Sequence, residues 1–355
     1  MNGGGKIEGS FSAIIKNIGF ARLVLGIFFI FLMILGFYLN IGMGKIAGDI
    51  LKRVGMNGIL VLAMVPSIQS GTGPNFALPV GIVCGLLGIT CAIDFRLTGL
   101  TCILAACAMA AVFASVAGFF YGKLLNAVKG AEMMIATYTG FSIVAVSCLA
   151  WLMIPFSNPS MAWFMGKGLR ETVQLDVVNA GQVFDRFLQF QIGETVVPTG
   201  LLLVVGLFCF GVYLFFLSKT GLAISAGGMN PKFSHASGLN IDRNRIIANV
   251  LSTILGAIGI IVYSQSFGFV QLYTAPLMMA FPAVAAVLIG GATASRAKVS
   301  HVVIGVVLFQ GLLTISLPVT NKIFAGTDIS EIMRAAIQNG IILYALTQVK
   351  GVIKK

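Results

Sequence analysis

The sequence predicts an all-α, polytopic membrane protein with about ten transmembrane helices. Of its 355 residues, 58% are hydrophobic and only 10% are charged, which is more apolar surface than a soluble domain of this length can bury. The apolar residues form long runs separated by short polar segments, and there are 43 glycines but no glycine-rich linker. Because glycine lets helices pack closely in lipid, we expect residues 1–355 to form a single transmembrane domain.

Five spans are predicted in the amino-terminal half. A polar segment with Lys6, Lys16 and Arg22 precedes the first apolar run. This run is too long for the hydrophobic region of a cleaved signal peptide and lacks a small-x-small cleavage site, so it predicts an uncleaved span. Residues 44–53 predict a short amphipathic connection to the second span. The five predicted spans are residues 23–39, 57–69, 78–93, 99–121 and 133–155.

A break interrupts the chain after the second span. Pro66 lies inside the apolar run, and residues 70–75, Ser-Gly-Thr-Gly-Pro-Asn, cannot continue a helix. Backbone groups freed at such a break need protein or a water-lined cavity around them, and discontinuous helices line solute sites in transporters. A simple cytoplasmic turn between two full spans is the alternative. The candidate pathway residues here are Gln69, Ser70, Thr72, Asn75 and Phe76.

The carboxyl-terminal half begins with the longest polar region, residues 156–196, which we expect outside the membrane. Within it, Val183, Phe184, Phe187 and Leu188 recur at helical spacing with polar residues on the other side. This pattern predicts an interfacial helix. The remaining predicted spans are residues 197–217, 246–264, 280–290, 301–317 and 332–346.

A polar and basic segment, residues 218–245, separates the sixth and seventh spans and cannot lie in hydrocarbon. Asn230 followed by Pro231 predicts a helix start, because Asn accepts hydrogen bonds from free amides and Pro needs no donor in the first turn. Gly238 is the matching stop. The sequence therefore predicts a compact helix of about two turns over residues 231–237.

The same segment carries a family resemblance. Its pattern consists of Lys-Thr at 219–220, Gly-Gly at 227–228, Asn230, a short helix with Ala and Ser, Ser-Gly-Leu-Asn at 237–240, and Arg243. This pattern resembles the cytoplasmic coupling loop of the ribose and galactose type permeases, which are the transmembrane subunits of ABC importers. The family also includes branched-chain amino acid and nucleoside permeases.

The resemblance is strongest over residues 198–310 and continues at residues 283–292, Ala-Val-Ala-Ala-Val-Leu-Ile-Gly-Gly-Ala. Relatives typically carry Gly-Gly-x-Asp-Leu-Ser after the second span, whereas this chain has Gly-Pro-Asn-Phe-Ala-Leu at residues 73–78. The missing carboxylate puts an ordinary ribose-like specificity in doubt.

The resemblance implies an ABC importer permease fold and three kinds of protein partner. A second permease chain, identical or paralogous, would complete the pathway, cytoplasmic ATPase subunits would bind below it, and an extracytoplasmic solute-binding protein, soluble or lipid-anchored, would deliver the solute. The helix after Asn230 would dock in an ATPase groove, with Phe233 as anchor and Lys232 at the rim. The residues expected at this contact are Asn230, Pro231, Lys232, Phe233, Ser234, His235, Ala236, Ser237 and Gly238.

The sequence predicts no enzymatic role for this chain. It contains no G-x-x-x-x-G-K-[ST] motif, so ATP would be bound by the partner subunit and this chain would hold no cofactor. The six cysteines lie in apolar segments without C-x-x-C spacing, and no catalytic cluster or metal site is expected. Lys and Arg residues that flank lipid explain the net charge of +12, so nucleic acid is not an expected partner.

Two uncharged stretches bear on the solute. No charged residue lies between Arg53 and Asp94 or between Arg245 and Arg296. Ion-coupled carriers usually keep an ionisable residue in mid-membrane, so this argues against the rival reading, an ion-coupled secondary transporter acting alone. It also predicts a neutral polar solute such as a sugar or a nucleoside. Further candidate pathway residues are Gln265 and Phe267.

The basic residues predict the orientation. With the amino terminus inside, most Lys and Arg residues, including Lys123 and Lys219, fall on the cytoplasmic side, as the positive-inside rule requires. Lys45, Lys52 and Arg53 fall outside and do not fit this arrangement. We expect a multi-pass protein of the bacterial inner membrane with both termini in the cytoplasm.

Overall fold

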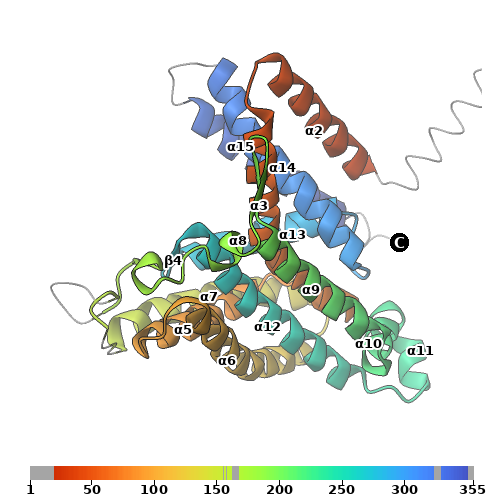
Figure 1. Cartoon of the computed structure of the whole chain (residues 1–355). Coiled ribbons are helices and arrows are strands. Elements are labelled where there is room, and N and C mark those ends of the chain that lie inside the picture. The colour runs from red at the N-terminus through yellow and green to blue at the C-terminus, as the bar shows by residue number, and fades with distance from the viewer. Residues whose placement is uncertain (1–19, 155, 157, 162–167, 324–328, 351–355) are drawn as a thin grey trace, which may run out of the picture.

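The computed structural model describes residues 20–154, 156, 158–161, 168–323 and 329–350 (Figure 1). Nearly all regular structure in this part of the chain is helical. Six helical stretches there are long and apolar enough to cross a membrane, and three shorter apolar helices accompany them. The prediction of an all-α membrane protein is confirmed, whereas the total of about ten spans stays a prediction. The predicted polar segment ahead of the first span, with Lys6 and Lys16, lies outside the described residues.

The amino-terminal half folds into helices that follow the predicted spans, with one exception. The helices are α2 (Phe20–Tyr38), α3 (Met43–Leu62), α4 (Met64–Gln69), α5 (Leu78–Asp94), α6 (Gly99–Ala127) and α7 (Glu132–Met153). The prediction of a short connection over residues 44–53 is wrong, because α3 runs without interruption through this segment. Ile46 and Ile50 on its apolar face are buried, and this packing extends the helix toward its amino terminus.

The carboxyl-terminal half combines long helices with two small antiparallel sheets. Its helices are α8 (Val183–Arg186), α9 (Thr199–Leu217), α10 (Lys219–Met229), α11 (Pro231–Ala236), α12 (Ile241–Phe267), α13 (Ala275–Ile289), α14 (Val299–Ile323) and α15 (Ile329–Lys350), with a 3-10 turn η1 (Asp176–Val178). Strands β1 (Thr172–Gln174) and β4 (Phe269–Gln271) pair with each other, and β2 (Phe190–Ile192) pairs with β3 (Thr195–Val197).

The predicted interfacial helix in the 156–196 region is largely wrong. Within residues 183–188, one turn, α8, is helical; Phe187 is extended and Leu188 has a φ of 53°. Asp185 lies on the buried side with 6% of its surface exposed. The apolar spacing misled the prediction because Asp185 faces inward to meet polar groups of α12, and the chain then leaves the helix to form the β2–β3 hairpin.

Helices α5, α6 and α12 pack side by side and form the centre of one group, while α2, α14 and α15 lie together on the other side of α3 (Figure 1). Small residues allow the close approach. A Cβ on Gly85 would overlap the Ala257 carbonyl oxygen and the Ile260 side chain of α12, and one on Gly88 would lie 2.6 Å from the Ala106 carbonyl oxygen of α6. Backbone therefore meets backbone at these crossings, which is the usual way helices associate in lipid.

We expect Gly85→Ala to destabilise the α5–α12 contact, because overpacking a tight core typically costs about 1–3 kcal/mol. Gly211→Ala in α9 is the matched control, since a Cβ there meets nothing within 4 Å. The measurement is the midpoint of heat unfolding of the full chain in detergent. Equal midpoints for the two variants would contradict the packing argument.

Candidate functional site

A compact helical unit made of α10 and α11 projects at one end of the molecule (Figure 1). The Ser218 hydroxyl accepts the Gly221 amide at 3.2 Å and starts α10. The Asn230 side chain accepts the Phe233 amide at 3.1 Å and starts α11. Gly238 has a φ of +78° and ends the segment. The predicted Asn-Pro start and Gly stop are thus confirmed, with Ser237 as the cap after α11 instead of its last helical residue.

Helix α11 presents an apolar side chain to the surroundings of the chain. Phe233 is 68% exposed, Lys232 beside it is exposed, and Ser234 is buried against the rest of the molecule. A large exposed aromatic on a protruding helix is typical of a protein contact. The remaining residues predicted for this contact, Asn230, Pro231, His235, Ala236, Ser237 and Gly238, are exposed as well.

The α10–α11 unit touches the break that follows α4. A Cβ on Gly71 would lie 3.0 Å from the Cα of Gly228 in α10, and a Cβ on Gly228 would overlap the Gln69 carbonyl oxygen. Gly71 has a φ of +78°, a conformation that favours glycine. Two glycines therefore bring the α10–α11 unit and the break into direct backbone contact.

Hydrogen bonds within the protein satisfy the polar groups of the break. Ser67 Oγ donates to the Gly73 carbonyl at 2.8 Å, Thr72 Oγ1 donates to the Ser67 carbonyl at 2.9 Å, and Ser70 Oγ donates to the same carbonyl at 2.8 Å. All four residues lack the exposed surface that would let water replace these bonds. These bonds are what allow an irregular segment to be buried inside the protein.

Asn75 ties the break to two helices. Its Oδ1 accepts the Tyr121 hydroxyl of α6 at 3.0 Å, and its Nδ2 donates to Ser252 Oγ of α12 at 2.9 Å. Ser252 in turn donates to the Ala63 carbonyl between α3 and α4 at 2.6 Å. Asn75 is 1% exposed, so the structure places it inside the protein, away from the large cavities.

The other residues predicted for the pathway are divided between two ends of the molecule. Gln69 donates through Nε2 to the Ala297 carbonyl at 2.5 Å, and Phe76 lies against Phe281 with ring centroids 5.9 Å apart. Gln265 and Phe267 lie at the far end of α12. The structure therefore does not bring the break and the 265–267 segment into one site.

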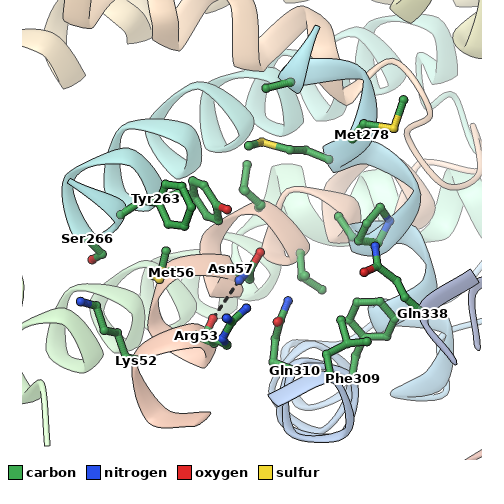
Figure 2. A pocket seen from close by; sticks show the side chains of 18 of the residues that line it. Lys52, Arg53, Met56, Asn57, Tyr263, Ser266, Met278, Phe309, Gln310 and Gln338 are labelled. Atoms are coloured by element: carbon green, nitrogen blue, oxygen red, sulfur yellow. Dashed lines mark hydrogen bonds between the residues drawn. The ribbon is translucent and has the colours of Figure 1, made fainter. Parts of the chain in front are cut away.

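A cavity of about 560 Å³ lies at the carboxyl-terminal end of α12, between α3, α12, α13, α14 and α15 (Figure 2). Side chains from α3 and α12 lie opposite those of α14 and α15. The lining includes the apolar side chains of Met56, Met278 and Phe309, which come from three different helices, and Phe267 is the only predicted pathway residue in it. The polar lining comprises Asp49, Lys52, Arg53, Asn57, Gln182, Tyr263, Ser266, Gln271, Gln310 and Gln338.

Sequence reasoning missed most of this cavity. It assigned residues 44–53 to an external connection, whereas α3 carries Asp49, Lys52 and Arg53 into the cavity wall. The available signal was the misfit of Lys45, Lys52 and Arg53 with the predicted orientation. Charged residues that do not fit a loop assignment often line a water-filled cavity.

Asp185 is the centre of a buried polar cluster beside the cavity. Its Oδ2 accepts Ser266 Oγ at 2.6 Å and Gln265 Nε2 at 3.0 Å. Its Oδ1 lies 3.8 Å from Lys52 Nζ and has no hydrogen-bond partner. Gln265 also accepts the Phe184 amide at 3.1 Å. Gln265 therefore fastens α8 to α12 and is not a lining residue of the cavity.

The charges around the cavity balance in sign. Lys52 and Arg53 carry two positive charges, and Asp49 and Asp185 carry two negative charges.

Beyond the cavity, Tyr273 donates to the Leu169 carbonyl at 2.9 Å. Burial, followed by Cys148 and Glu171, raises the pKa of the Tyr273 phenol, so this group stays a hydrogen-bond donor in the segment between β4 and α13.

The cysteines and the acidic residues of the described chain form no further site. The six cysteines are free thiols. Among the described residues, no group of three or more His, Cys, Asp or Glu side chains is arranged to hold a metal ion.

Comparison with protein families gives one match. Residues 17–346 match the family described as the permease component of the branched-chain amino acid transport system. No match was found among curated proteins or among solved structures. The matched range includes the α10–α11 unit, the break and every residue of the cavity lining.

We expect Asp185→Asn to loosen the segment that contains α8. The charge-assisted bonds from Ser266 and Gln265 would weaken and the ion pair with Lys52 would be lost, at a cost of about 1–3 kcal/mol. The measurements are the midpoint of heat unfolding and the rate of protease cleavage between residues 182 and 198. Glu171→Gln, the same change at an exposed carboxylate, is the control and should leave both unchanged.

Proposed function

The chain belongs to the family of ABC permease components that includes the branched-chain amino acid permeases, and from this premise we propose that it moves a polar solute without net charge, such as a sugar or a nucleoside, inward across the bacterial inner membrane. It is a transport subunit whose family works with ATPase and solute-binding components. The observation that carries the proposal is the position of two features on one helix. Helix α12 begins beside the protruding α10–α11 unit and ends at the cavity.

A cytoplasmic ATPase is the proposed partner of α11. The 68% exposed Phe233 would enter an apolar groove of that ATPase, and Lys232 would lie at the rim. Closure of two ATPases on ATP binding would move the α10–α11 unit as a rigid body and change access to the pathway. This assigns the cytoplasmic side to α10 and α11 and, with it, both termini of the chain.

The proposed pathway runs from the cavity along α3 and α4 to the break. Asp49 to Val61 of α3 line the cavity, and the same stretch of chain continues into the break within a few residues. Gln69, Ser70, Thr72, Asn75 and Phe76 would then close the inner part of the pathway in the state described here. A second permease chain, identical or paralogous, would complete the wall, and an extracytoplasmic binding protein would load the cavity.

A solute without net charge fits the electrostatics of the cavity. The two bases and two acids around it balance, and the carboxamides of Asn57, Gln271, Gln310 and Gln338 offer paired donors and acceptors. Apolar side chains of the lining, such as Met278 and Phe309, would cover a ring face of a sugar or a nucleobase. An anion would meet Asp49 in the lining and Asp185 beside it as well as the two bases.

Uptake into proteoliposomes tests the function. We expect a reconstituted complex of permease, ATPase and loaded binding protein to accumulate solute only with ATP, because the chain has no nucleotide-binding motif of its own. The permease alone should accumulate no solute under a proton or sodium gradient. Accumulation by the lone chain under a gradient would instead establish a secondary transporter.

Phe233→Asp tests the coupling contact. A carboxylate in place of the anchor would be buried without a partner in the ATPase groove, so we expect the stimulation of ATP hydrolysis by loaded binding protein to be lost. Phe233→Leu keeps an apolar anchor and should retain most of the stimulation. The amount of permease in the membrane should be equal for both variants. Full stimulation in the Asp variant would remove α11 from the coupling mechanism.

A further inference from the structure

A largely buried ion pair lies where the α10–α11 unit, the break and two long helices meet. Arg245, in the second turn of α12, places Nη2 2.8 Å from Oε1 of Glu132, the first residue of α7. The two side chains are only 13% and 14% exposed. Most ion pairs at a surface contribute little, but a pair that is largely removed from water is costly to break by removing one partner.

The same guanidinium also holds the break. Arg245 Nη2 donates to the Gly71 carbonyl at 3.3 Å. Gly71 has left-handed backbone geometry and touches Gly228 of α10 on its other side. Gly71 of the break is thus held between the α10–α11 unit and Arg245.

A cavity of about 660 Å³ lies between α11, the start of α12 and the break, and its lining includes Gly71, Gly228 and Arg245. Other residues at the break, Asn75 and Gln69, are bonded to α6, α12 and the 297 turn. A displacement of α10 and α11 can therefore reach the break through the Gly228–Gly71 contact while Arg245 keeps the break attached to α12.

We propose that Arg245 is a positioning residue for transport, whose bond to the Gly71 carbonyl makes the inner end of the pathway move together with α12 when the ATPases displace α11. The proposal rests on the proposed function. Glu132 fixes the direction of the guanidinium. Its second carboxylate oxygen, Oε2, accepts the Gly130 amide at 2.8 Å, and this bond keeps the carboxylate from rotating away from Arg245. Coupling between distant sites requires such a contiguous set of contacts between elements that have two arrangements.

Arg245→Gln tests the proposal in the reconstituted complex. We expect the amount of solute transported per ATP hydrolysed to fall about tenfold, the order of a typical coupling between sites, while ATP hydrolysis continues. Lys129→Gln is the matched control. Lys129 forms an ion pair of 2.6 Å with Asp242 in the same region, but both side chains are more than half exposed, so its loss should leave the transport ratio unchanged.

The charge-swapped chain, Glu132→Arg with Arg245→Glu, separates positioning from support of the fold. It restores an ion pair between α7 and α12, so the midpoint of heat unfolding should return toward that of the unchanged protein. A glutamate at position 245 cannot donate to the Gly71 carbonyl, so the transport ratio should stay low. If Arg245→Gln does not reach the membrane, the swapped chain alone decides.

Each outcome is informative. A normal transport ratio in Arg245→Gln or in the swapped chain would overturn the positioning role, and failure of both chains to insert would show that the contact serves folding and would overturn it as well. ATP-driven uptake by the unchanged complex is measured in parallel. Its absence would refute the proposed function itself, whatever the variants do.

Discussion

A backbone polar group that is buried away from water needs a hydrogen-bond partner inside the protein, and the structure around residues 70–77 follows from that constraint. The chain stops being helical there, and side chains inside the protein provide hydrogen bonds to several of the polar groups that this frees. Hydroxyls of Ser67, Ser70 and Thr72 satisfy backbone carbonyls locally. Asn75 reaches α6 and α12, so the same bonds that make the break tolerable also join it to the helices that surround it.

The central helices α5, α6 and α12 are continuous elements. Helix α12 has 27 residues, a length of about 40 Å at 1.5 Å per residue, and it packs against α5 and α6 through small residues such as Gly85 and Ala257. Because backbone meets backbone at these contacts, few side-chain rotamers can rearrange there. A displacement at one end of α12 is therefore not absorbed by side chains. The protruding α11, the break and the cavity therefore lie along one stiff element, and any solute pathway in this chain must accommodate that arrangement.

The sequence predicted the parts that local chemistry controls. The start of α11 at Asn230 and Pro231 and its stop at Gly238 depend on capping groups within a few residues, so the pattern was sufficient. The cavity depends on tertiary packing between residues that are distant in the sequence. Residues 43–62 have no strong breaker, and only packing of Ile46 and Ile50 against the core makes them one helix. Asp185 was misjudged for the same reason, since its partners Gln265 and Ser266 lie about eighty positions away in the sequence.

This difference limits what charge-free stretches can say about a solute. The absence of charge between Arg53 and Asp94 describes segments that pack mostly against neighbouring helices, whereas the cavity takes its charges from Arg53 at the edge of that stretch and from Lys52 and Asp49, one and four positions before it. Arg53, Lys52 and Asp49 tolerate this location because the cavity is open to water and Asp185 lies within 3.8 Å of Lys52. The argument for a neutral solute therefore has to be made from the balance of charges around the cavity. That balance includes Asp185, which lies beside the cavity and is held by Ser266 and Gln265, so the buried cluster at α8 contributes to the charge around the cavity as well as to the fold.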